Sequence, residues 1–145
     1  ADGIWLDNLG FRPKDLEQRR AKEIRNARLL SRWSGILFGG VAFKYQEAVS
    51  LTDLAVITRL ARDYCDVITT SGEATGEAPE LRKIQLMRDA VENSAVIAIA
   101  SGMTPENVGA FLAYVDCFLV ATGVSKSFTE FDPKKVEAFS RALKG

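Results

Sequence analysis

Short apolar runs alternate with longer amphipathic segments along the whole chain, and this alternation limits the possible folds most strongly. The apolar runs have the length of buried strands, and the segments between them carry apolar residues at helical spacing. The expected strands are 3–6, 35–43, 66–70, 95–100 and 117–121, and the expected helices are 15–30, 51–64, 79–91, 105–114 and 133–143. Five successive βα units predict an α/β protein with a parallel sheet and right-handed crossovers.

The composition fits a single domain without a global charge. The chain has 145 residues, 47% of them hydrophobic, which is enough for one real core. Nineteen basic and nineteen acidic side chains cancel, so nothing in the net charge favours nucleic acid or an anionic membrane as a partner. No apolar run has the length of a membrane span, and nothing resembles a cleavable signal. We therefore expect a cytoplasmic protein without membrane insertion.

The absence of histidine restricts the chemistry that this sequence can carry. The usual general base and the commonest zinc ligand are missing, so any reaction must use carboxylates, lysine, hydroxyls or backbone amides. No metal site is predicted, and the one cofactor considered is a divalent cation held together with a phosphate. The two cysteines, Cys65 and Cys117, lie at the starts of expected strands and are predicted to be small buried thiols.

The carboxyl ends of the expected strands carry the candidate binding residues, because parallel strands end at one edge where ligands bind. Two strands end in glycine turns, at Gly102 and Gly123, and Thr104 is expected to cap a helix that begins at Pro105. Free amides at such starts bind anions. The candidate ligand- and phosphate-binding residues are Ser71, Gly72, Thr75, Gly76, Ser101, Gly102, Met103, Thr122, Gly123, Val124, Ser125 and Lys126, with Ser127 assisting.

Three further strand-end residues are candidates for catalysis. Lys44 is expected on the same face as Gly40 and Ala42, where a desolvated amine could act as a base or form a Schiff base. The alternative is a simple electrostatic clamp or ion-pair partner. Asp7 and Glu73 could serve as general acid and base or hold a divalent cation, and their alternative roles are helix capping and loop solvation.

Four stretches resemble the C-terminal part of the BtpA family, which also includes SgcQ-like proteins. They are VAFKYQ at 41–46, VITTSGEATGEAP at 67–79, IASGMTPENV at 99–108 and FLVATGVS at 118–125. The resemblance covers nearly the whole chain and implies a TIM-barrel fold related to phosphate-binding barrels. For one branch it implies a role in photosystem I biogenesis at the thylakoid surface, with peripheral membrane association, but it implies no defined reaction.

A TIM barrel has eight βα units, so the resemblance implies that residues 1–145 are one (βα)5 segment equivalent to units four to eight. We expect the chain to associate with the missing N-terminal units or with a second copy of itself, because a barrel wedge exposes sheet edges. The alternative fold is an open, doubly wound five-stranded sheet. Many relatives carry a histidine where Tyr45 stands here, so a catalytic role for that position does not carry over.

Two classes of function remain open from the sequence. The first is a protein that binds or converts a phosphorylated small metabolite of the sugar phosphate class, as a lyase or isomerase that uses lysine and carboxylates. The second is a non-catalytic assembly factor. A third possibility is that the segment alone is inactive, because a barrel mouth draws residues from several strands.

Overall fold

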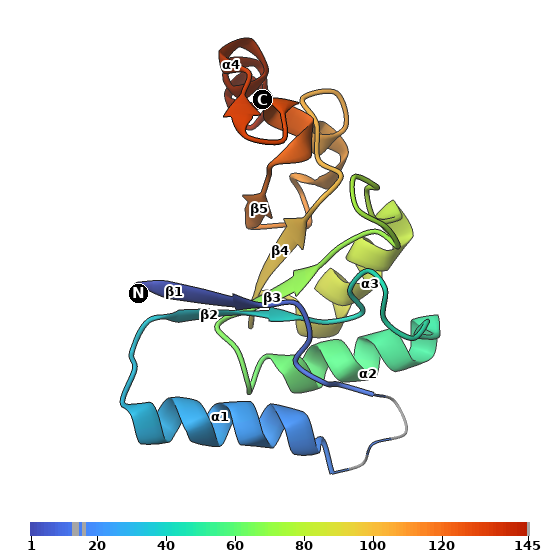
Figure 1. Ribbon diagram of the computed structural model, residues 1–145. Coiled ribbons are helices and arrows are strands. Elements are labelled where there is room, and N and C mark those ends of the chain that lie inside the picture. Colours follow the sequence, from blue (N-terminus) through green and yellow to red (C-terminus); the bar gives the residue numbers. More distant parts are fainter. Residues whose placement is uncertain (13–14, 16, 145) are drawn as a thin grey trace.

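The computed structural model describes residues 1–12, 15 and 17–144, and it contains a five-stranded parallel sheet (Figure 1). The strands are β1 (Gly3–Leu6), β2 (Ile36–Gly40), β3 (Val67–Thr70), β4 (Val96–Ala100) and β5 (Cys117–Leu119). The α-helices are α1 (Arg19–Ser31), α2 (Leu51–Ala61), α3 (Leu81–Val91) and α4 (Pro133–Ala142). The expected succession of strands and helices is therefore confirmed for most of the chain.

The strands lie in chain order, β1-β2-β3-β4-β5, and this order decides between the two expected sheet architectures. A doubly wound sheet reverses its strand order at one point, whereas a barrel adds each strand beside the previous one. Figure 1 shows α1, α2 and α3 on the same side of the sheet, as successive right-handed crossovers require. The fold is a curled half-barrel, and the doubly wound alternative is wrong.

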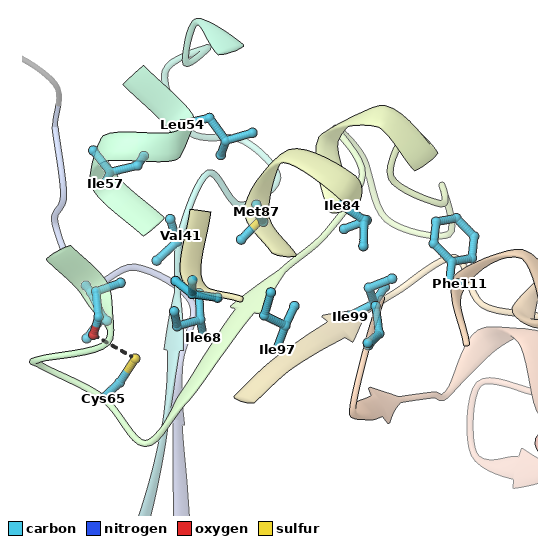
Figure 2. Close-up of a cluster of buried hydrophobic side chains, with 14 of the residues drawn as sticks. Val41, Leu54, Ile57, Cys65, Ile68, Ile84, Met87, Ile97, Ile99 and Phe111 are labelled. Atoms are coloured by element: carbon cyan, nitrogen blue, oxygen red, sulfur yellow. Dashed lines mark hydrogen bonds between the residues drawn. The ribbon is translucent and has the colours of Figure 1, made fainter. Parts of the chain in front are cut away.

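The core lies between the sheet and the helices. Ile68, Ile97 and Ile99 point from the strands toward Ile84 and Met87 on α3, and all five side chains are fully buried (Figure 2). This packing explains why the residues on the helix-facing side of the strands are apolar. The opposite face is more open, and its side chains of Trp5, Ile36 and Val96 remain 45%, 50% and 41% exposed.

At the edge where the strands begin, an arginine and an aspartate form an ion pair that is also hydrogen-bonded to the main chain, called the charged clamp below. Arg28, in the last turn of α1, lies 2.7 Å from the carboxylate of Asp66 and donates to the carbonyl oxygen of Gly35 at 2.8 Å. The same Asp66 oxygen accepts from the Leu37 amide at 2.7 Å. One carboxylate therefore joins α1, β2 and the start of β3.

The same clamp recurs between α3, β4 and β5. Arg88 forms an ion pair with Asp116, and Asp116 accepts from the amide of Ile97 at 2.8 Å. Arg88 also donates to the carbonyl oxygens of Ala95 and Tyr114 at 3.1 and 3.0 Å. These polar contacts stand at the amino ends of the strands, the face of a barrel that serves stability.

Several element boundaries differ from those expected. The expected helix 15–30 begins only at Arg19, since Gln18 has a left-handed φ of 49°. Pro13, predicted in the preceding loop, and Leu16, predicted in the helix, lie outside the described residues. The expected strand 35–43 ends at Gly40, because Ala42 and Tyr45 adopt φ values of 47° and 61°. The shared face expected for Gly40, Ala42 and Lys44 is therefore lost.

The segment after β4 differs most from the expectation. The expected helix 105–114 is replaced by turns and a short 3-10 helix, η1 (Val108–Phe111). After β5 the chain forms a second 3-10 helix, η2 (Thr122–Val124), and a small antiparallel hairpin of β6 (Ser125–Ser127) and β7 (Glu130–Phe131), which the sequence did not predict. The last helix is confirmed, with Asp132 as its cap. Among the described helices, none has the length and apolar character that crossing a membrane requires.

Candidate functional site

The loops that follow the strands are tied to one another along the carboxyl edge of the sheet. The side-chain amide of Gln46, after β2, donates to the Asp7 carbonyl oxygen after β1 at 2.7 Å. The amide of Lys44 donates to the hydroxyl of Ser71, after β3, at 2.9 Å. These two hydrogen bonds link the loops after β1, β2 and β3, and Asp7 and Lys44 contribute to them with main-chain atoms.

Further hydrogen bonds link the loops after β2 and β3 to the last strands. The hydroxyl of Tyr45 lies 3.2 Å from that of Thr75, which holds the long loop after β3 against the loop after β2. This hydrogen bond lowers the pKa of Tyr45. Farther along, the Gly76 amide donates to the Ser101 hydroxyl at 2.9 Å, and the Ser101 amide donates to the Leu119 carbonyl oxygen at 3.4 Å.

A cavity of about 320 Å³ opens after β4 and β5, where the phosphate site was predicted. Four predicted residues line it, namely Gly76, Gly102, Thr122 and Gly123, together with Thr104, Pro105, Glu106 and Lys135, which were not predicted as ligand contacts. The structure therefore gathers residues from the loop after β3, from both glycine turns and from the first turn of α4.

The glycines in this cavity have different roles. A Cβ atom on Gly123 would lie 1.9 Å from the Met103 carbonyl oxygen, and one on Gly102, where φ is 75°, would lie 2.2 Å from the Ala78 amide nitrogen. These two glycines allow protein loops to pack closely. Gly76 has a φ of 86° and nothing within 4 Å of its Cβ position, so space is open beside it.

The amides expected to hold a phosphate are partly used inside the protein. Val124 donates to the Ala121 carbonyl oxygen at 3.0 Å, and the Ser125 amide donates to that of Thr122. The helix expected to begin at Pro105 is absent, so a helix dipole does not contribute there. Within the part of the chain that the structure describes, the amides of Gly102 and Met103 have no hydrogen-bond acceptor.

The cation of the cavity is Lys135, a residue that sequence reasoning missed. Its ammonium group donates to the Ser125 carbonyl oxygen at 3.0 Å. Glu106 lies nearby, and its hydrogen bond with Thr104 lowers the pKa of the Glu106 carboxyl, with a smaller contribution from the positive charge of Lys135. The cavity therefore contains an ionised carboxylate, whose negative charge opposes the binding of a further anion. A dipeptide of lysines after a helix-capping Asp-Pro was the available signal.

The predicted residues 125–127 form strand β6 and do not line this cavity. Lys126 lies 3.5 Å from Glu130 in an exposed ion pair, and the Ser125 hydroxyl donates to the Ala121 carbonyl oxygen at 2.8 Å. Val124 and Met103 are buried, so their side chains contribute packing.

A second pocket, of about 650 Å³, lies between the loops after β2 and β3, and it contains another lysine that was missed. Lys83, on α3, donates to the carbonyl oxygens of Ala42 and Ser71 at 2.6 and 2.8 Å. Burial lowers the pKa of Lys83 to about 8, although Glu73 and Glu80 oppose this shift. The available signal was helical spacing, because Lys83 precedes the buried Met87 and Val91 by four and eight residues and therefore lies on the same side of α3.

The catalytic assignments stay predictions. Lys44 is half-buried, with its ammonium 5.7 Å from the Phe43 ring centre, Asp7 is exposed, and Glu73 lines the pocket of Lys83. Burial raises the pKa of Cys65 to about 12 and also raises that of Cys117, so both thiols stay protonated at neutral pH. Among the described residues, no group of three or more cysteine, aspartate or glutamate side chains could hold a metal ion.

Comparison with known sequences decides the family. The sequence model of the BtpA family matches residues 12–145. The chain belongs to the BtpA family. An uncharacterised protein of Pyrococcus abyssi is 25% identical over 141 residues, which are 96% of this chain and 53% of that protein. The photosystem I biogenesis protein BtpA of Synechocystis is 32% identical over 92 residues, which are 61% of this chain and 32% of that protein. This chain thus spans about half the length, or less, of these relatives.

Two solved structures share the fold of this BtpA-family chain. N-(5'-phosphoribosyl)anthranilate isomerase from Pyrococcus furiosus has a TM-score of 0.62 at 17% identity. The match covers 98% of this chain and 72% of the isomerase chain. The phosphoribosyl anthranilate isomerase of Thermus thermophilus has a TM-score of 0.55 at 16% identity, with coverage of 86% and 67%. At this identity the likeness shows the barrel fold alone.

Proposed function

We propose that this chain carries the phosphate-binding part of a barrel protein that binds a phosphorylated small metabolite of the sugar phosphate class. The observation that carries this proposal is the cavity after β4 and β5, which combines Lys135, Thr122 and the open side of Gly76. The fold relatives named above are isomerases whose names contain a phosphoribosyl group, which supports the same ligand class.

The cavity offers complementary groups for a phosphate. The ammonium of Lys135 supplies the charge, the hydroxyls of Thr104 and Thr122 can donate, and the amide of Gly102 adds a further donor. Glu106 also lines the cavity, and its exposed carboxylate must point away from a bound phosphate because the two negative charges repel. We expect phosphate binding to weaken when a competing anion such as sulfate is added.

Conversion of the ligand is a further step of the proposal. Lys44, Asp7 and Glu73 would act on the sugar part as base, acid or electrostatic clamp in a lyase or isomerase reaction. The curated relatives are about twice as long or longer, so the rest of the barrel mouth would come from residues outside this chain.

Replacing Lys135 with methionine is expected to weaken the binding of ribose 5-phosphate about tenfold or more, because a charge-assisted hydrogen bond contributes roughly 1.5–3 kcal/mol. The measurement is isothermal titration with ribose 5-phosphate, inorganic phosphate and ribose. Lys134→Met is the matched control, since Lys134 is the exposed neighbour of Lys135 and does not line the cavity. An equal loss of affinity in both variants, or ribose binding as tight as that of ribose 5-phosphate, would contradict the proposal.

The second candidate function is a non-catalytic assembly factor, which the name of the Synechocystis relative favours. The same titrations separate the two classes. If a cooperatively folded chain binds none of the phosphorylated compounds at millimolar concentration, the assembly function becomes the better proposal.

A further inference from the structure

A third cavity lies at the other edge of the sheet, where the strands begin, and it has no part in the function proposed above. It measures about 380 Å³ and is formed by the end of α1, the turn before β2 and the turn before β3. It is lined by the guanidinium groups of Arg25, Arg28, Arg32 and Arg62 and by the rings of Trp33 and Tyr64, together with two carboxylates.

One of these arginines already has its charge neutralised. Arg28 is paired with Asp66 and bonded to the Gly35 carbonyl oxygen in the clamp described above. Its guanidinium also lies 5.4 Å from the Trp33 ring centre, so the clamp holds this ring as one wall of the cavity. Arg28 and Asp66 therefore build the cavity and add little net charge to it.

The remaining arginines leave positive charge in excess. Arg25 lies 4.8 Å from the centre of the Tyr64 ring and has no carboxylate partner among the described residues. Arg32 is exposed, and the described part of the chain provides no carboxylate partner for it either. Arg62 lies 3.6 Å from Asp63 in a largely exposed ion pair, and such a pair holds its two side chains together only weakly.

We propose that this cavity is a binding site for a nucleoside phosphate. Arg25, Arg32 and Arg62 supply the charge that a phosphate group requires, and guanidinium groups bind phosphate oxygens in a bidentate manner. Trp33 and Tyr64, whose rings lie beneath Arg28 and Arg25, add aromatic surface to the lining, and such surface suits a nucleobase better than it suits an inorganic anion. The volume is within the range of ligand pockets.

The test is titration of the chain with ADP, adenosine and inorganic pyrophosphate, in the Lys135→Met background so that the phosphate cavity does not contribute. We expect ADP to bind more tightly than either fragment, and binding to weaken as salt is raised. The double variant Arg25→Gln/Arg32→Gln should weaken ADP binding about tenfold or more. Arg19→Gln is the matched control, because Arg19 is exposed on the same helix and pairs with Glu17.

Each possible result decides the proposal. A loss in the double variant with none in Arg19→Gln supports it, provided that both variants unfold at the same temperature as the parent. Equal affinity for pyrophosphate and ADP would overturn the nucleoside part, and equal affinity for adenosine and ADP would overturn the phosphate part. ADP binding that survives the double variant, or no ADP binding at millimolar concentration, overturns the site.

Discussion

Replacing Asp116 with alanine is expected to lower the free energy of unfolding by about 2 kcal/mol. The substitution removes the partner of Arg88, whose side chain is only 15% exposed, and leaves the amide of the fully buried Ile97 without an acceptor. A fully buried pair would lose more, but the Asp116 side chain is 48% exposed and water partly replaces it. Urea unfolding followed by circular dichroism measures the difference.

Asp63→Ala is the matched control for this prediction. Asp63 also precedes a strand and lies near an arginine, Arg62, but the two groups are 3.6 Å apart and largely exposed. Its replacement should change the stability by less than about 0.5 kcal/mol. A loss in Asp116→Ala no larger than in Asp63→Ala would show that the clamp contributes nothing beyond a surface ion pair.

The order and type of most elements could be predicted because apolar periodicity reports burial directly. β4 is an uninterrupted apolar run in which four of the five residues are buried, and α3 shows its buried face at Ile84, Met87 and Val91. The curled sheet followed from the repetition of βα units together with the resemblance, because periodicity alone does not give the strand order.

The segment 104–114 shows where local signals mislead. Thr104-Pro105-Glu106-Asn107 has the composition of a helix start, but the Asn107 side chain accepts from the Thr104 amide and donates to the Gly102 carbonyl oxygen, both at 2.8 Å. These local hydrogen bonds compete with a helical turn, and Gly109 in the middle weakens a helix further. The result is the short η1, whose existence depended on side-chain geometry that a sequence pattern does not reveal.

The candidate site could be predicted only as an edge of the sheet. The rule that ligands bind at the carboxyl ends of strands led to Gly76, Gly102 and Gly123, which do line one cavity. Lys135 and Lys83 come from helices and reach this edge through tertiary packing. Their contribution depends on the distance between elements, which the sequence does not contain.

Raising the pH from 7 to 9.5 is expected to stabilise the wild-type chain by about 2 kcal/mol relative to a Lys83→Met variant. The pKa of Lys83 is about 8 in the folded chain and close to the ordinary lysine value of 10.5 in the unfolded chain. Between these values the unfolded chain binds more protons, so stability rises with pH. Below about pH 8 both states are protonated, and the contribution of Lys83 stays constant.

The contacts of Lys83 explain why losing its proton costs no hydrogen bond. A neutral amine keeps two N–H donors, which suffices for the carbonyl oxygens of Ala42 and Ser71. Deprotonation therefore removes the desolvation penalty of the buried ammonium while the tie between the loops after β2 and β3 stays. Glu73 and Glu80 attract the ammonium and limit the shift, and Glu77 lines the same pocket.

Urea unfolding at half-unit pH steps tests this prediction, with the stability of Lys83→Met subtracted from that of the wild type at each pH so that other titrating groups cancel. Lys83→Arg is the second comparison, because an arginine stays charged throughout this range and should show no such rise. Parallel pH curves for the wild type and Lys83→Met would contradict the prediction. A difference that grows from pH 8 upward would identify Lys83 as a buried amine that is partly neutral under mildly alkaline conditions, the state in which a lysine acts as a nucleophile.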